Sequence, residues 1–354
     1  IHATGVAGEL TLSAALNLDA IPGLTATGTA KVQVNTTPVA IDETFTFTGG
    51  DTFELTLPAG QYLRVEVTIP TNGLQLDIGG GVGSISASGT LALERITRDD
   101  GTQITLIGIT DFTAEVDVAS NIATVTNGQG ALAVVDTGIA GIISGEVDIA
   151  VGPVGAGGTV TVRLNTSGVA VDEIIEIDGR SLPIRFGAGE GNVFQVSVSG
   201  LSLNIGDFVT IEGDVTFNGD TFAGTNLEVF LGQGPARLDT GEINPLATGV
   251  LLTDATIALR KGSVADTYAL SATGTIQVVG VEGVTIAGTA SVRFNNTGID
   301  TDELITIPGS DSDVVLRVLD GAAIFEGTNL VIDVLGQSLS GDLAFSKQLG
   351  DAGT

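Results

Sequence analysis

The stretch GGTVTVRLNTSGVAVDEIIEIDG, residues 157–179, occurs in two further versions in the chain. They are TGTAKVQVNTTPVAIDETFTFTG at residues 27–49 and AGTASVRFNNTGIDTDELITIPG at residues 287–309. One asparagine occupies the same position in each version, and these residues are Asn35, Asn165 and Asn295. The interval between successive asparagines is constant (165 − 35 and 295 − 165). A fixed interval of this length is the signature of a tandem repeat, and it decides the architecture before any other feature.

The repeat has a period of about 130 residues and divides the chain into three units, 1–133, 134–263 and an incomplete third at 264–354. Because the sequence starts at Ile1 without a methionine and stops inside the third unit, we expect a processed product or a segment of a longer protein.

The repeated stretch has the periodicity of β-strands. Every second residue of TVTVRL (159–164) is aliphatic, and this alternation predicts a half-buried strand that ends at an Asn-Thr turn. A second strand is expected at Asp172–Ile177, with counterparts at Asp42–Phe47 and Asp302–Ile307. The 51 glycines and short Asn, Asp and Gly turns favour antiparallel neighbours, and no stretch has the spacing of an amphipathic helix. The sequence therefore predicts an elongated, all-β tandem array of antiparallel meander or sandwich repeats, with a β-solenoid as the alternative.

The charge of the chain excludes several classes of partner. It holds 42 acidic and 13 basic residues, a formal net charge of −29, which disfavours nucleic acid and anionic membrane surfaces. No apolar run is long enough to predict membrane insertion, and the lack of cysteine excludes a disulfide framework without excluding export. Strong like charge keeps an exposed polymer soluble where salt screens the repulsion, so we expect an extracellular or cell-surface setting.

The inventory of reactive residues argues against an enzyme. The single histidine is His2, cysteine is absent, and the GxSxG, P-loop and GxGxxG spacings do not occur. We therefore expect no catalytic residue and no organic cofactor.

Several segments together resemble the tandem repeats of giant secreted bacterial surface proteins. They are GTAKVQVNTT (28–37), LRV (63–65), GLQLDIGG (73–80) and GQSLSGDLAF (336–345), with the acidic pair that follows the first. Some of those proteins carry an LEPR-XLL-type sorting region, and others are RTX-like adhesins. The resemblance implies cell-surface, adhesive or filament-forming architecture and does not imply an enzyme. The RTX nonapeptide GGxGxDxUx is absent here, so calcium binding of that kind is not expected.

Two sets of residues are candidate sites. Asn35, Asn165 and Asn295 each begin an N-x-[ST] sequon, which predicts glycosylation at an exposed turn. The alternative is that these asparagines and hydroxyls satisfy the amides of the turn. Paired acids follow each asparagine and are weak candidates for calcium ligands, since hard cations take oxygen ligands; they are Asp42, Glu43, Asp172, Glu173, Asp302 and Glu303. Adjacent strand residues point to opposite faces, so the alternative is a solvated acidic surface.

The sequence as a whole favours a structural protein. We expect an acidic repeat segment of an extracellular filament, stalk or surface layer, in which copies associate end to end as a homopolymer by strand packing. The alternative is the repeat region of a cell-surface adhesin that binds sugars or calcium, with a polysaccharide or cell surface as the partner.

Overall fold

The fold was analysed in a computed structural model of the 354-residue chain. The structure describes residues 5–17, 24–77, 83–97, 101–118, 121–151, 154–205, 209–238, 240–265, 267–307 and 313–346.

The described residues form 22 β-strands. The first repeat contributes β1 (Ala7–Asn17), β2 (Leu24–Asn35), β3 (Ile41–Thr46), β4 (Thr52–Leu57), β5 (Tyr62–Asp77), β6 (Gly83–Thr97), β7 (Gln103–Val118) and β8 (Asn121–Val135). The second contributes β9 (Gly138–Val151), β10 (Val154–Asn165), β11 (Val171–Ile177), β12 (Arg180–Phe186), β13 (Val193–Ile205), β14 (Val209–Asn218), β15 (Thr221–Gln233) and β16 (Thr248–Lys261). The third contributes β17 (Tyr268–Val279), β18 (Val284–Asn295), β19 (Thr301–Thr306), β20 (Asp313–Val318), β21 (Ala323–Val334) and β22 (Gln337–Ser346).

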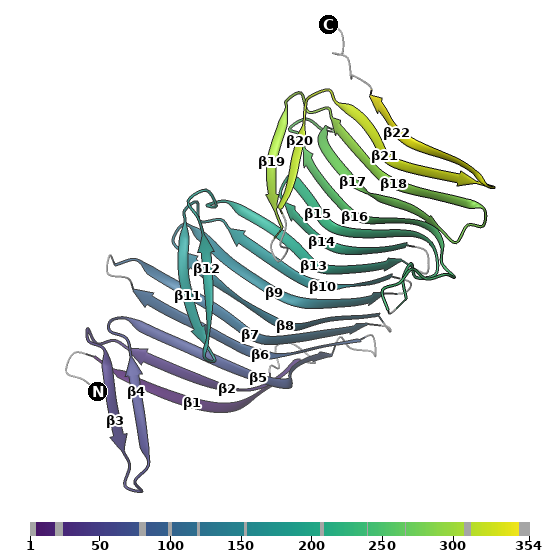
Figure 1. Cartoon of the computed structure of the whole chain (residues 1–354). Helices are drawn as coiled ribbons and strands as arrows, with labels where there is room; N and C mark the ends of the chain where they lie inside the picture. The colour runs from purple at the N-terminus through teal and green to yellow at the C-terminus, as the bar shows by residue number, and fades with distance from the viewer. Residues whose placement is uncertain are drawn as a thin grey trace. The chain divides into compact units, whose positions relative to one another are not determined.

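Sixteen of these strands make one antiparallel meander, in the order β1-β2-β5-β6-β7-β8-β9-β10-β13-β14-β15-β16-β17-β18-β21-β22 (Figure 1). The other six form three two-stranded hairpins, β3–β4, β11–β12 and β19–β20. Each hairpin leaves the large sheet directly after the strand that ends in the repeated asparagine. The tandem repeat therefore appears in the structure as a run of sheet strands interrupted by one hairpin at the same place.

The contacts divide the chain into two compact units. One comprises Ile1–Val147 and Val162–Phe194, and the other comprises Asp148–Thr161 and Gln195–Thr354. The boundary between them runs through β9 and β10, so it does not follow the repeat boundaries of the sequence.

Bulges bend the long strands near their middles. The pairing register shifts between Ser88 and Thr90, where Gly89 has φ +140°, and between Ile109 and Phe112, where Asp111 has φ +50°. A bulge adds one residue to one strand of a pair and increases the local bend, and glycine and aspartate tolerate the positive φ.

Hairpins β11–β12 and β19–β20 supply the main hydrophobic cores by covering one face of the sheet. Hairpin β11–β12 lies against β6, β7 and β8, and hairpin β19–β20 lies against β15 to β18 (Figure 1). The residues buried under β11–β12 are Ala92, Ile104, Leu106, Ala131, Ala133, Ala140, Val171, Ile175, Ile177, Ile184 and Phe186. Small residues on the sheet let the hairpin approach closely: a Cβ built on Gly108 would lie 3.1 Å from the side chain of Ile175.

The predicted all-β fold and antiparallel meander are confirmed, and the described strands do not form the alternative solenoid. No helix occurs among the described residues, so none there is long and apolar enough to span a membrane. The sequence did not predict that two strands of each repeat would leave the sheet and cover its face.

Candidate functional site: the asparagine-anchored hairpins

The repeated asparagine holds each hairpin to the sheet. The Nδ2 amide of Asn165 donates to the carbonyl of Val169 at 2.9 Å and to that of Glu190 at 2.8 Å. Its Oδ1 accepts from the backbone N–H of Ser167 at 2.9 Å and from the Ser167 hydroxyl at 2.7 Å. Together these hydrogen bonds connect the segment before β11 with the segment after β12. The side chain therefore closes the base of the hairpin.

The other two repeats reproduce this geometry. In the first repeat, Asn35 donates to the carbonyls of Val39 and Pro58 and accepts from the hydroxyl of Thr37. In the third repeat, Asn295 donates to the carbonyls of Ile299 and Val318 and accepts from the hydroxyl of Thr297. All three asparagines are 0% exposed. Glycosylation at these sequons stays a prediction. In the folded geometry the amide nitrogen is buried and both of its hydrogens donate to carbonyls, so a glycan on this nitrogen would replace one of these hydrogen bonds.

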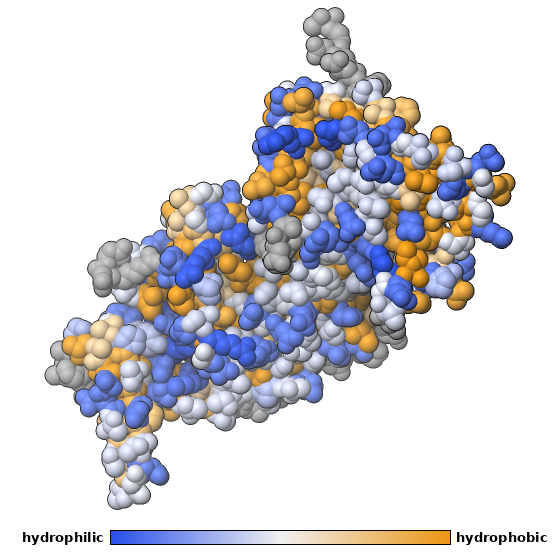
Figure 2. Space-filling model, viewed as in Figure 1, coloured by the Kyte–Doolittle hydropathy of each residue, from blue (hydrophilic) through white to orange (hydrophobic). Residues whose placement is uncertain are grey.

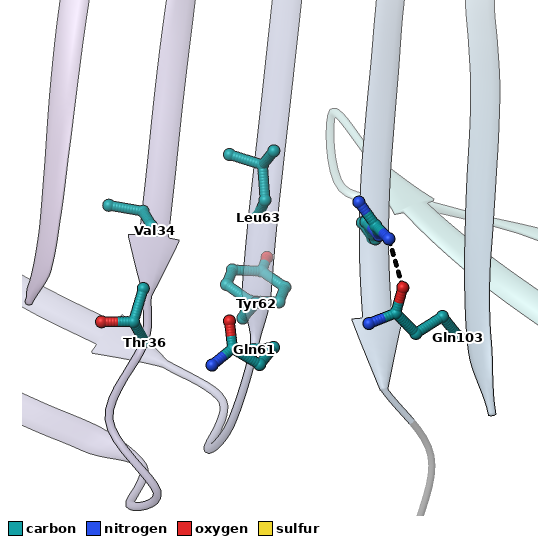
Figure 3. Close-up of a pocket in the computed structure, with 7 residues that line it drawn as sticks. Val34, Thr36, Gln61, Tyr62, Leu63 and Gln103 are labelled. Atoms are coloured by element: carbon teal, nitrogen blue, oxygen red, sulfur yellow. Dashed lines mark hydrogen bonds between the residues drawn. The ribbon is translucent and has the colours of Figure 1, made fainter. Parts of the chain in front are cut away.

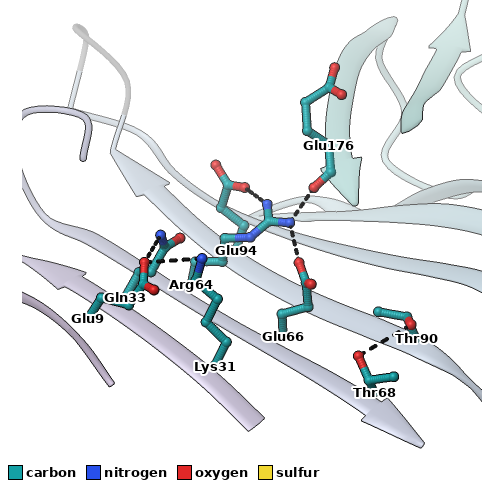
Figure 4. A network of polar contacts seen from close by, with 9 residues as sticks. All are labelled: Glu9, Lys31, Gln33, Arg64, Glu66, Thr68, Thr90, Glu94 and Glu176. Atoms are coloured by element: carbon teal, nitrogen blue, oxygen red, sulfur yellow. Dashed lines mark hydrogen bonds and ion pairs between the residues drawn. The ribbon is translucent and has the colours of Figure 1, made fainter. Parts of the chain in front are cut away.

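The far end of hairpin β11–β12 is held by an arginine on β5 (Figure 4). The Nη1 and Nη2 atoms of Arg64 lie 2.8 Å from carboxylate oxygens of Glu94 and Glu66, and Nη2 also donates to the carbonyl of Glu176 on β11. Burial alone would lower the pKa of Arg64, but the hydrogen bonds with Glu66 and Glu94 outweigh it and raise that pKa. The guanidinium therefore stays charged and bridges the sheet and the hairpin.

The third repeat has a corresponding contact. The Nε2 amide of Gln195 on β13 donates to the carbonyl of Thr306 on β19 at 3.3 Å. Thr306 lies one repeat period (306 − 176) after Glu176, so both contacts fix the same point of their hairpins. Each of these two hairpins is thus fastened at its base by an asparagine and at its far end by a polar side chain of the preceding repeat.

The first residue of each acidic pair points away from the sheet. Asp172 lies 3.2 Å from Arg185 on the neighbouring hairpin strand, and Asp302 lies 3.0 Å from Arg317 in the same way. Asp42 accepts a hydrogen bond from Thr56 at 3.5 Å. These contacts are exposed cross-strand pairs, which contribute little stability.

The second residue of each pair lies on the other face of its hairpin, and in the second and third repeats that face is directed at the sheet. Glu173 is buried, Glu303 forms an ion pair with Arg260, and Glu43 is exposed. The structure therefore separates the two acids of each pair, as alternation along a strand requires. Among the described residues no group of three or more Asp, Glu, His or Cys side chains could hold a metal ion. Calcium binding by the six acids stays a prediction without a described cluster to support it.

A pocket lies beside the base of hairpin β3–β4 (Figure 3). Its lining residues come from β2, β5, β6, β7 and the adjoining turns, and they are Val34, Thr36, Gln61, Tyr62, Leu63, Arg95 and Gln103. Arg95 donates to the side chain of Gln103 across this pocket. Burial, and then the nearby charge of Glu94, raise the pKa of Tyr62 to about 12. The phenol therefore stays protonated at neutral pH and cannot act as a base there.

Sequence reasoning located the asparagines and the acidic pairs but missed Arg64, Gln195 and Tyr62. A hydroxyl two residues after each asparagine was the available sign of the buried turn. Nothing in the local sequence around Arg64 indicated a contact with Glu176, which lies 112 residues away. His2 lies outside the described residues.

Comparison of the chain with protein-family models, with curated proteins and with solved structures found no match. The resemblance to the repeats of bacterial surface proteins therefore stays a prediction.

Proposed function

We propose that this chain is a structural repeat segment of an extracellular filament, stalk or surface layer, in which copies join end to end. The observation that carries the proposal is an uncovered aliphatic surface that continues to the first strand of the sheet. Leu10 on β1 is 55% exposed and pairs with Val32, which pairs with Val65. The row continues through Leu93 to Ile107 on β7.

This aliphatic row lies on the face opposite to the hairpins. Leu93 follows Ala92, which is buried under β11–β12, so alternation directs Leu93 to the other side of the sheet. The second compact unit has a comparable row across β14 to β18, made of Phe217, Phe222, Leu259, Leu270 and Phe294. Contiguous exposed apolar surface on a protein marks a site of interaction.

The sheet also ends in strands that can accept a partner. In the described sheet order β1 and β22 stand at the two ends, and a terminal strand presents N–H and C=O groups that template pairing. Both end strands carry exposed large side chains, Leu12 on β1 and Leu339 and Phe345 on β22. Figure 2 shows hydrophobic surface around the strands near β22.

The number of strands suits a head-to-tail contact. In an antiparallel sheet of sixteen strands the first and last run in opposite directions. If a second copy adds its β1 beside β22 in the same orientation, the new pair is antiparallel as well. Such a contact is heterologous and stays open, so it adds copies without closing a ring and builds an elongated assembly. The net charge of −29 opposes lateral clumping of these assemblies.

A proline on the free side of β1 tests the edge contact. The N–H of Thr36 donates to the carbonyl of Val6 at 2.9 Å, so Val6 is in a hydrogen-bonded pair with β2. Alternation then directs the N–H of Thr11 toward the free edge. Thr11→Pro removes that donor and leaves the pairing of β1 with β2 intact, whereas Thr11→Val keeps the donor.

We expect the wild-type protein and Thr11→Val to form assemblies that lengthen with protein concentration, and Thr11→Pro to stay monomeric with an unchanged circular dichroism spectrum. Sedimentation velocity and electron microscopy measure this. A wild-type protein that stays monomeric at every concentration would refute the proposal.

A further inference from the structure

The first hairpin lacks the cover that its counterpart in the second repeat has. Phe45 on β3 and Phe47, which follows the last residue of that strand, are 49% and 59% exposed. Their counterparts one repeat period later (175 − 45 and 177 − 47) are Ile175 and Ile177 on β11. Both are 0% exposed, because they are buried between hairpin β11–β12 and the sheet. The hairpins share one register, because Phe45 pairs with Phe53 just as Ile175 pairs with Leu182. The two phenylalanines therefore lie on the face of the hairpin that the second repeat buries.

The base of hairpin β3–β4 is packed normally, and only its far half is uncovered. Leu55 and Leu57 are buried with Tyr62 against the sheet. Strand β4 contacts β1 and β2, and the far half of the hairpin extends past β1 (Figure 1). The rings of Phe45 and Phe53 lie side by side with centroids 6.3 Å apart and planes tilted by 34°, so the far half presents a preformed aromatic surface.

The other end of the sheet has a surface without a hairpin over it, whereas the first hairpin lacks a sheet beneath its far half. Each of β6, β14 and β22 contains a glycine with positive φ, Gly89, Gly213 and Gly341. The residue three positions after each is Ala92, Thr216 or Ala344. Ala92 is 0% exposed and Thr216 is 1% exposed, whereas Ala344 is exposed.

The equivalence of these positions extends to their cross-strand partners. Ala92 pairs with Glu66 on β5, and Ala344 pairs with Glu326 on β21, which lies two repeat periods (326 − 66) after Glu66. The same face of β21 carries Ile324 where β5 carries Arg64. Strands β21 and β22 therefore offer a surface of the type that a hairpin covers elsewhere in the chain, with an apolar residue in place of the charged one.

We propose that the far half of hairpin β3–β4 in one copy docks on the β21–β22 surface of a second copy. This inference deepens the end-to-end assembly proposed above and rests on it. A second copy of this chain is the expected partner, because in the second repeat this face of the hairpin is covered by sheet strands of the chain itself. The side chains also match in size, since the bulky Phe45 and Phe47 would meet the small Ala344 and Ser346. Both residues on β22 are exposed and available.

The chain contains no cysteine, so introduced thiols report contacts without background. Two versions of this 354-residue chain with different mass tags are mixed under mild oxidation, one carrying Phe47→Cys and the other Ala344→Cys. A disulfide forms only where the two Cα atoms approach within about 7 Å. The matched controls are the sequence neighbours Thr46→Cys, at the last residue of β3, and Phe345→Cys, which lies on the opposite face of β22 from Ala344.

The expected result is a mixed-tag dimer from Phe47→Cys with Ala344→Cys that exceeds every pair containing a control cysteine. A second variant, Phe45→Asp with Phe47→Asp, should weaken association at least about a hundredfold in Kd, because two aromatic side chains lose their burial. Its control is Thr44→Asp with Thr46→Asp. Hydrogen exchange at Leu55 and Leu57 checks that the base of the hairpin stays folded in both.

Three results would overturn the inference. One is equal cross-linking of Ala344→Cys to Thr46→Cys and to Phe47→Cys, and another is preferential pairing of Phe47→Cys with itself. The third is capture of the hairpin by phosphatidylcholine vesicles in place of the mixed-tag dimer. If assemblies form and respond to Thr11→Pro while no mixed-tag dimer appears, the docking is wrong and the end-to-end contact stands.

Discussion

The substitution Asn165→Asp tests whether the buried amide closes the base of hairpin β11–β12. Aspartate has the shape of asparagine and keeps the oxygen that accepts from Ser167. It replaces the Nδ2 donor with a second oxygen, which then faces the carbonyls of Val169 and Glu190. Those carbonyls lie 2.9 and 2.8 Å from the present nitrogen, so the variant brings like partial charges together in a site that is 0% exposed.

The magnitude follows from the groups left without partners. Two buried carbonyls lose their donor, and a buried group without a partner costs about 1–3 kcal/mol. We therefore expect the local free energy of opening the hairpin to fall by about 4 kcal/mol at pH 7.

The effect has a characteristic pH dependence. The protonated acid can donate to one of the two carbonyls, so the folded state raises the pKa of the introduced carboxyl above its unfolded value of about 3.9. A group with a raised folded pKa stabilises most below the unfolded pKa and loses that contribution as pH rises through the folded pKa. The variant should therefore be least destabilised below about pH 4.

Native-state hydrogen exchange with mass spectrometry measures this locally, on peptides that cover β11 and β12. The matched control is Asn192→Asp, which makes the same charge change at an exposed residue near the same hairpin. Equal exchange rates for Asn165→Asp, Asn192→Asp and the wild-type protein at pH 7 would refute the role of the buried amide.

Two further predictions concern the packing of the sheet. Because the pKa of Tyr62 is raised to about 12, the tyrosine ionises first in the unfolded chain, so the free energy of unfolding should fall by about 2 kcal/mol between pH 10 and 12. Absorbance at 295 nm follows the titration in the Tyr268→Phe variant, where Tyr62 is the remaining tyrosine. A titration midpoint near pH 10 would contradict the raised pKa. Replacing Gly108 with leucine should destabilise hairpin β11–β12 by about 1–3 kcal/mol, since even a Cβ at this position would lie 3.1 Å from the side chain of Ile175. Chemical denaturation followed by circular dichroism measures the loss of stability. If the two side chains compete for this space, the double variant Gly108→Leu with Ile175→Ala should recover part of that loss.

Local patterns were sufficient to predict the strands. Alternating aliphatic residues define β10 and β11, and the asparagine between them marks the turn. The same reasoning placed Asn165 at an exposed turn, whereas its side chain is buried. Turn chemistry is local and readable, but burial depends on the carbonyl of Glu190, which lies 25 residues further along the chain.

The sequence by itself determined that this protein is a tandem β-repeat with a large excess of acidic residues. Strand periodicity, glycine turns and net charge are properties of neighbouring residues and of composition, and they need no knowledge of the fold. Tertiary structure alone decided that two strands of each repeat leave the sheet and lie over strands that precede them. That choice depends on close packing between distant residues, such as Ile175 against Gly108, and on the contact between Arg64 and Glu176. It also decided that Phe47 is exposed where Ile177 is buried, because the same local pattern is covered by a sheet in one repeat and not in the other.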